Sequence, residues 1–126
     1  MAATKKTILL VEDDEFLAEL YATKLNLEGF EVLLAADGEK GFKMARDKRP
    51  DLILLDIILP KMDGFEVLKS IKSDKSASSI PVILLTNLSQ KDEVKKGLEL
   101  GAIDYLIKAH FMPSEVVKKI KQALGA

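Results

Sequence analysis

The chain has 126 residues, a hydrophobic content of 48% and a formal net charge of −1. This length predicts one compact domain, because it is long enough for a single core and too short for two. The nearly neutral charge argues against a general affinity for nucleic acid or membrane surfaces, since both need a concentrated basic field. The absence of cysteine excludes disulfides, thiolate metal sites and thiol catalysis.

The sequence contains no signal that directs it to or through a membrane. The N-terminal MAATKK lacks the apolar core of a signal peptide, and no segment reaches the ~20 apolar residues of a membrane span. A reducing compartment also fits the lack of cysteine. We therefore expect a cytoplasmic protein without membrane contacts.

Strand and helix signals alternate along the chain. The first apolar, β-rich run is Thr7 to Val11, and the acidic stretch Glu12 to Glu15 follows it, with Asp13 or Asp14 as a good helix N-cap. Similar runs predict strands over residues 32–34, 52–56, 82–86 and 105–108. Helical spacing is predicted for these apolar residues: Leu17, Leu20, Tyr21 and Leu25; Phe42 and Ala45; Phe65, Val67, Leu68 and Ile71; Val94, Leu98 and Leu100; Val116, Val117, Ile120 and Leu124.

Glycine, proline and polar residues separate these elements. Gly29 and Gly101 close helices, and the pairs Asp37-Gly38 and Asp63-Gly64 predict turns. Ser73 to Ser79 is expected to be a polar loop. Five strand-helix units with short links predict an α/β fold, in which a doubly wound parallel sheet is covered by helices on both faces.

The third strand is the centre of the pattern. It lies in the stretch Asp51 to Pro60, where Leu52 to Leu55 do not alternate with polar residues, so both faces of the strand are expected to be buried. Asp56 ends this strand. A carboxylate in that position is either a cap for the next loop or a reactive group.

Polar residues follow four of the predicted strands. Glu12 and Asp13 follow the first strand, Asp56 ends the third, Thr86 ends the fourth and Lys108 ends the fifth. In open parallel sheets, ligands bind beyond the carboxyl ends of the strands. We therefore expect these side chains to meet on one rim.

The chemistry of that rim favours phosphate. Several carboxylates close together need a counter-charge, and Mg²⁺ is a hard cation that prefers oxygen ligands and phosphate. A lysine and a threonine hydroxyl opposite them suit an anionic group. An aspartate can attack a phosphoryl group and form an acyl phosphate. The sequence thus indicates a site that receives phosphate.

Five motifs follow the strands in order. They are Glu12 and Asp13; Asp56 with Pro60 and Asp63-Gly64; Thr86; Tyr105; and Lys108. In these motifs the sequence resembles the receiver domains of two-component response regulators, the family of the chemotaxis response regulator, over essentially all 126 residues. The resemblance implies a single receiver domain over residues 1–126. It also implies a flavodoxin-like fold, with five helices and a five-stranded sheet of order 2-1-3-4-5.

The resemblance also implies roles for individual residues. Asp56 would be the phosphoacceptor, phosphorylated by a histidine kinase or a histidine phosphotransfer protein. Mg²⁺ would be held by Glu12, Asp13 and Asp56 together with the backbone carbonyl of Ile58. Asp14 is expected to be a helix cap. The protein would not be an enzyme beyond its own phosphorylation and slow dephosphorylation.

The remaining implied roles concern the switch. Lys108 would pair with Asp56 and then with a phosphoryl oxygen, Thr86 would move to bond the phosphoryl group, and Tyr105 would fill the space that Thr86 leaves. The fourth helix, fifth strand and fifth helix would then present a changed surface to a downstream effector protein. The protein would act as a monomer or as a phosphorylation-dependent homodimer, either alone or as part of a longer regulator, without direct contact to nucleic acid.

Ala109 departs from the family pattern, and two further positions bear on the lifetime of the phosphate. Ala109 replaces a proline that usually follows a cis peptide bond, and a cis bond to a non-proline costs roughly 2.5–4 kcal/mol. We therefore expect Lys108-Ala109 to be trans and the loop around His110 to be rearranged. Ile58 offers no polar side chain to guide water, and Asn87 is bulkier than the usual small residue. Both predict slow self-dephosphorylation.

Other functions remain open at this stage. A phosphohydrolase with an aspartate nucleophile would need an acid two residues after Asp56, where Ile58 stands. A flavodoxin-like electron carrier would need a loop for a flavin phosphate, and the chain has no Ser/Thr/Gly-rich loop after its first strand. A receiver-like module that binds partners without phosphorylation is the third alternative. Separately, Thr86 could be an ordinary β-branched strand residue and Tyr105 an ordinary half-buried one.

Overall fold

The computed structural model describes residues 5–86, 91–107 and 113–125. Five strands form one parallel sheet in the order β2-β1-β3-β4-β5, which confirms the predicted topology. The strands are β1 (Thr7–Val11), β2 (Glu31–Ala35), β3 (Leu52–Asp56), β4 (Val82–Thr86) and β5 (Asp104–Ile107). Because all strands are parallel, their carboxyl ends lie at the same edge of the sheet.

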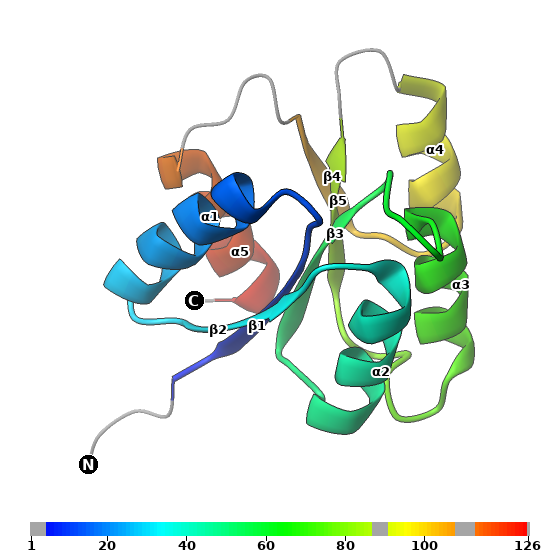
Figure 1. Ribbon diagram of the computed structural model, residues 1–126, viewed down its shortest axis with the longest axis horizontal. Helices are drawn as coiled ribbons and strands as arrows, with labels where there is room; N and C mark the ends of the chain where they lie inside the picture. Colours follow the sequence, from blue (N-terminus) through cyan, green and yellow to red (C-terminus); the bar gives the residue numbers. More distant parts are fainter. Residues whose placement is uncertain (1–4, 87–90, 108–112, 126) are drawn as a thin grey trace.

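Helices connect the strands and cover both faces of the sheet. They are α1 (Glu15–Leu27), α2 (Gly38–Lys48), α3 (Gly64–Ser73), α4 (Lys91–Glu99) and α5 (Pro113–Leu124). Figure 1 shows α1 and α5 on one face and α2, α3 and α4 on the other. The result is the three-layer, doubly wound arrangement expected for alternating strands and helices.

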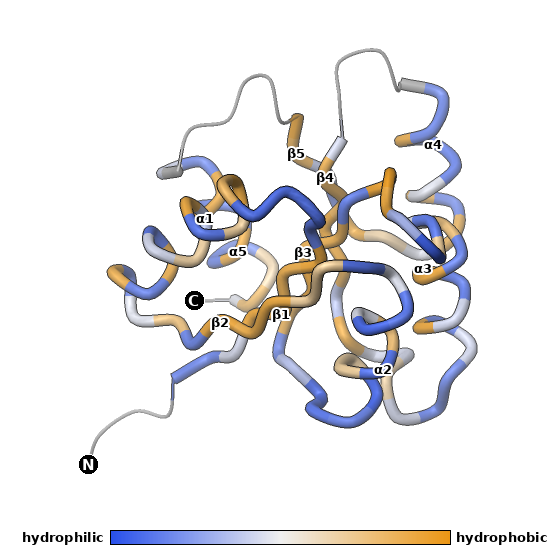
Figure 2. The backbone as a smooth tube through the Cα atoms, viewed as in Figure 1, coloured by the Kyte–Doolittle hydropathy of each residue, from blue (hydrophilic) through white to orange (hydrophobic). Residues whose placement is uncertain are grey.

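The core consists of two apolar clusters, one on each face of the sheet. Alternate residues of β3 supply both: Leu52 and Leu54 pack with α1 and α5, whereas Ile53 and Leu55 pack with α2 and α3. All four side chains are fully buried. Figure 2 shows the strands as the hydrophobic centre of the molecule. Burial of each such side chain stabilises the fold by about 1.5–3 kcal/mol, which explains why polar residues do not alternate here.

Three helices begin at an aspartate that caps them. The carboxylates of Asp14, Asp37 and Asp63 accept hydrogen bonds from the backbone N–H three residues later, at 3.1, 2.8 and 3.0 Å. Asp14 is therefore the cap of α1, as predicted. The Asp37-Gly38 and Asp63-Gly64 pairs were predicted as turns; instead each pair is the N-cap and first residue of a helix. The reason is that the aspartate side chain satisfies a free N–H group of the first helical turn.

Some apolar residues that mark the predicted elements lie at the surface. Leu20 on α1, Leu34 on β2 and Leu98 on α4 are 41%, 46% and 39% exposed. β2 is an edge strand, so Leu34 has a neighbouring strand on one side only. The buried residues of α1 are Ala18, Tyr21 and Leu25. Helical spacing identified the elements correctly but did not identify every buried position.

Candidate functional site

The site lies at the carboxyl end of the sheet, where β1 and β3 are neighbours. Val11 pairs with Leu55 in the register of these two strands, so Glu12 and Asp56 come next on adjacent strands. The backbone N–H of Glu12 still donates to Ala35 on β2 at 3.0 Å, which continues the ladder. The sheet register thus brings together two acids that are 44 positions apart in the sequence.

Three carboxylates converge at this edge. Glu12, Asp13 and Asp56 each offer an oxygen that lies within 4.8 Å of the others. Glu12 is 3% exposed and Asp56 is 4% exposed, whereas Asp13 is open to solvent. Exposed acids often lie near each other, but two buried carboxylates at this distance repel each other, and a cation between them relieves that repulsion. An all-oxygen donor set of this kind fits a hard divalent ion.

The negative charge of this cluster affects the pKa of Tyr21 on α1. The tyrosine side chain is 1% exposed and belongs to the core between α1 and the sheet. Burial, reinforced by the negative charges of Glu12 and Asp56, raises the pKa of its phenol. The sequence pattern identified Tyr21 only as a core residue of the helix. The one signal in the sequence is a hydroxyl in an otherwise aliphatic stripe.

Backbone N–H groups orient the two buried carboxylates. The N–H of Ile58 donates to Asp56 Oδ1 at 3.0 Å, and the N–H of Asp14 donates to Glu12 Oε2 at 3.2 Å. In both cases the donor lies two residues after the acid, so each carboxylate is fixed by the loop that follows its own strand. The Ile58 side chain is 58% exposed.

Thr86 and Tyr105 lie on the same face of the sheet. Tyr105 pairs with Leu84 in the register of β4 and β5, and Thr86 lies two residues after Leu84. Residues two apart on a strand share a face. Thr86 is 1% exposed, and Tyr105 is half-buried with Lys119 Nζ 5.4 Å from its ring centre.

Four of the predicted positions have no structural account. Lys108 lies outside the described residues, as do Asn87, Ala109 and His110. The described structure therefore brings together Glu12, Asp13 and Asp56 and places Thr86 at the end of β4, a strand that pairs with β3. The Lys108-Ala109 bond and the aim of the lysine remain predictions.

A comparison with protein families identifies the chain. The family model of the response regulator receiver domain matches residues 8–121. The chain belongs to this family. Receiver domains are signalling modules of two-component systems, as the motifs at the strand ends had indicated.

Curated relatives include longer transcriptional regulators. The chain is 41% identical over 119 residues to the alkaline phosphatase synthesis transcriptional regulatory protein PhoP of Bacillus subtilis, covering 94% of this chain and 48% of the relative. It is 38% identical over 124 residues to the DNA-binding response regulator MtrA of Mycobacterium tuberculosis, covering 98% of this chain and 53% of the relative. The chain thus spans about half the length of the curated relatives it matches. Because these relatives are named as a transcriptional regulatory protein and a DNA-binding response regulator, they do not support the expectation of no contact with nucleic acid.

Solved structures of receiver domains share the fold. A receiver domain of a sensor histidine kinase from Pseudomonas aeruginosa, solved with a magnesium ion coordinated in its active-site cleft, superposes with a TM-score of 0.89 at 30% identity, covering 98% of this chain and all of that one. The chemotaxis protein CheY4 of Vibrio cholerae gives a TM-score of 0.87 at 28% identity, covering 94% of this receiver domain and 98% of that chain.

Within the described residues, none of the helices combines the length and apolarity needed to cross a bilayer.

Proposed function

We propose that this receiver domain accepts a phosphoryl group on Asp56 in a reaction that depends on Mg²⁺. The observation that carries the proposal is the convergence of three carboxylates within 4.8 Å, two of them buried, from the ends of two neighbouring strands. The donors would be a histidine kinase or a histidine phosphotransfer protein. The magnesium ion in the related Pseudomonas receiver domain supports the choice of metal.

The residues present at the rim fit a magnesium ion. Carboxylate oxygens of Glu12, Asp13 and Asp56 would bind it, together with the backbone carbonyl of Ile58. When bound, the ion would neutralise the acidic cluster and the charge of an incoming phosphoryl group. Because Asp13 is exposed whereas Glu12 and Asp56 are buried, the ion would reach the site from the solvent side of Asp13.

In the transfer itself, the protein mainly positions the reacting groups and neutralises their charge. A carboxylate oxygen of Asp56 attacks phosphorus, the P–O bond forms, and the P–N bond to the donor histidine breaks, leaving its imidazole with the bonding electrons. The hydrogen bond from the Ile58 N–H to Asp56 Oδ1 fixes the orientation of the nucleophile. Lys108 would bind a phosphoryl oxygen as a point charge, and the Thr86 hydroxyl would donate to another.

The signal would then pass from the rim to the surface of α4, β5 and α5. Thr86 and Tyr105 lie on one face of the sheet, so a movement of Thr86 toward phosphate would open space that the Tyr105 ring can fill. The phosphoryl group needs only to bias two existing arrangements by a few kcal/mol. The surface would bind a downstream effector or a second copy of the domain.

Acetyl phosphate provides a direct test. The protein is incubated with Mg²⁺ and acetyl phosphate and its mass is measured. We expect a gain of one phosphate in the wild type and none in Asp56→Asn or when Mg²⁺ is removed by chelation. Asp51→Asn, five residues earlier at the other end of β3, is the matched control and should gain the phosphate. A wild type without a mass gain would favour the module that binds partners without phosphorylation.

A further inference from the structure

We propose that Gly38, the first residue of α2, is a positioning residue for the loop of residues 57–63. This loop joins β3 to α3 and contains Ile58, whose carbonyl belongs to the proposed magnesium site. The inference therefore rests on the proposed function. It extends that function to a residue at the start of α2, outside the acidic cluster. Three observations on α2 and the loop carry it.

The first observation is the close approach of α2 to the loop backbone. A Cβ atom added to Gly38 would overlap the carbonyl oxygen of Met62 and would lie 2.7 Å from Cγ2 of Val67. Gly38 is not among the residues with positive φ, so its backbone conformation does not demand glycine. Glycine is needed here because the start of α2 rests directly on the loop.

The second observation is that the loop is tightly wound and has little room to absorb a shift. The N–H of Met62 donates to the Pro60 carbonyl at 2.8 Å, and Lys61 between them has a left-handed φ of 68°. At its far end, the N–H of Gly64 donates to the Ile57 carbonyl at 2.7 Å. A Cβ atom on Gly64 would overlap the carbonyl oxygen of Asp56 itself. A displacement of Met62 is therefore transmitted along a short chain of contacts to Ile58 and Asp56.

The third observation is an ion pair at the same junction. Lys61 Nζ lies 3.7 Å from Asp37 Oδ2, while Asp37 Oδ1 accepts from the Lys40 N–H at 2.8 Å. The Asp37 side chain is almost entirely buried, but that of Lys61 is 63% exposed, so solvent weakens the pair. The steric contact at Gly38 therefore contributes most of the positioning and the ion pair a smaller part.

Gly38→Ala separates positioning from helix propensity. Alanine is the better helix former, so propensity alone predicts a more stable α2. The contact with Met62 predicts instead that the loop moves and the magnesium site loosens. Gly97→Ala on α4 is the matched control, because its Cβ would overlap the end of the Leu84 side chain rather than the backbone of this loop.

The experiment measures the dissociation constant for Mg²⁺ by calorimetry and the rate of phosphorylation by acetyl phosphate at saturating Mg²⁺, each beside thermal stability. We expect Gly38→Ala to bind Mg²⁺ about tenfold more weakly, as is typical when support of a metal ligand is lost, and Gly97→Ala to stay within about twofold of wild type. Wild-type affinity in Gly38→Ala, or equal losses in both variants, would overturn the inference. A wild type that binds no Mg²⁺ would instead contradict the proposed function and the inference with it.

Lys61→Met provides a second test that holds even if Gly38→Ala does not fold. Lys61 lies on the loop that carries Ile58, and removal of its positive charge would by itself leave Mg²⁺ binding unchanged or stronger. Loss of the contact with Asp37 should weaken it, and we expect about a twofold weaker affinity with little change in thermal stability. An unchanged or tighter affinity in this variant counts against the positioning role.

Discussion

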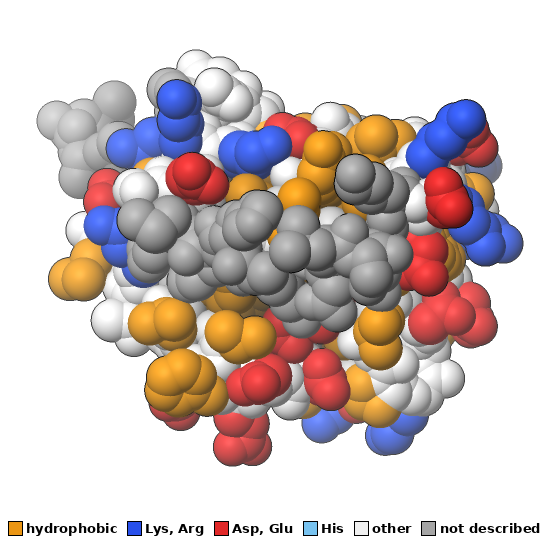
Figure 3. Space-filling view, turned by 90° about the horizontal axis from the view of Figure 1, so that it is seen from above, with side chains coloured by type: hydrophobic (Ala, Val, Ile, Leu, Met, Phe, Trp, Pro, Cys, Tyr) orange, Lys and Arg blue, Asp and Glu red, His pale blue; other side chains and the backbone are white. Residues whose placement is uncertain are grey.

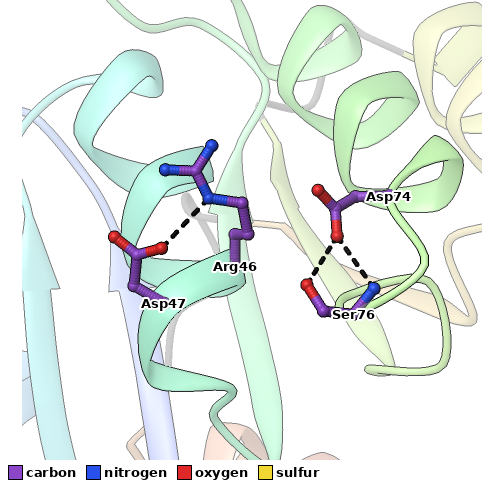
Figure 4. Close-up of polar contacts among 4 residues, drawn as sticks. All are labelled: Arg46, Asp47, Asp74 and Ser76. Atoms are coloured by element: carbon purple, nitrogen blue, oxygen red, sulfur yellow. Dashed lines mark hydrogen bonds and ion pairs between the residues drawn. The ribbon is translucent and has the colours of Figure 1, made fainter.

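At the amino-end edge of the sheet, Asp51 and Asp74 each accept hydrogen bonds from uncharged groups. At the carboxyl end, by contrast, Glu12, Asp13 and Asp56 converge on one another. Asp51 Oδ2 accepts from the Thr7 N–H at 2.7 Å and so ties the start of β3 to the start of β1. Asp74 Oδ1 accepts from both the N–H and the hydroxyl of Ser76, at 2.8 and 2.6 Å (Figure 4). These two aspartates are structural.

The two edges also differ in how they handle charge. The hydrogen bonds from the Ser76 hydroxyl and N–H, with Arg46 nearby, hold the pKa of Asp74 below its usual value. At the opposite edge, Glu12 and Asp56 add to the effect of burial in raising the pKa of Tyr21. Figure 3 views this carboxyl-end side, where acidic side chains lie beside exposed apolar ones. Convergence of carboxylates, rather than their number, distinguishes a site from a cap.

The largest expected effect is a difference in the response to Mg²⁺ between a substitution at the carboxyl-end edge and one at the amino-end edge. Asp13→Asn should weaken Mg²⁺ binding about tenfold or more, and with it the rise in Tm that saturating Mg²⁺ causes, because a ligand stabilises only through its affinity for the folded state. Without the metal, the same variant should be at least as stable as wild type, since one repulsive charge is gone. Thermal unfolding with and without Mg²⁺ tests both. Asp74→Asn should respond to Mg²⁺ like wild type.

At the amino-end edge, substitution of Asp51 should lower stability without changing Mg²⁺ affinity. Asp51→Ala removes the acceptor for the Thr7 N–H, and we expect a loss of about 1–2 kcal/mol in the free energy of unfolding. Urea titration measures this loss, and calorimetry should show unchanged Mg²⁺ affinity. A weaker affinity for Mg²⁺ in Asp51→Ala would mean that the two edges are not independent.

The third prediction concerns how fast phosphorylated Asp56 at the carboxyl-end edge loses its phosphate. Ile58 is exposed beside Asp56 and cannot hold an attacking water, so Ile58→Asn combined with Asn87→Ala should shorten the lifetime severalfold, less than the ~10²-fold of a complete general base. Decay of the phosphorylated protein after removal of the donor gives the rate. Equal or slower decay in the double variant would contradict the prediction that Ile58 and Asn87 slow self-dephosphorylation.

The smallest expected effect is the contribution of Asp74 to acid unfolding. Its pKa is lower in the folded protein than the usual 3.8, so the folded state binds fewer protons in that range. Its stabilising contribution is complete above that usual value and is lost as the pH falls through the lower folded pKa. Asp74→Asn should therefore flatten the acid limb of a stability profile measured from neutral pH to about pH 2. An unchanged acid limb would show that its hydrogen bonds persist after protonation.

The amino-acid sequence by itself determined the fold class and the acidic centre of the site. Uninterrupted apolar runs such as Leu52 to Leu55 identify strands buried on both faces, and alternation with helices makes those strands parallel. Parallel strands bring their carboxyl ends to one edge, so the residues that follow Val11 and Leu55 had to be close if β1 and β3 were neighbours. That adjacency came from the family resemblance, because local patterns do not encode strand order.

Only the tertiary structure decided which polar and small residues support the site. Gly38 and Met62 approach each other through the packing of α2 against the loop before α3, and no local propensity predicts a contact between them. The same holds for Tyr21, whose environment depends on the ends of β1 and β3 as well as on α1. Local sequence determines which element a residue joins, whereas burial and close approach depend on how separate elements pack.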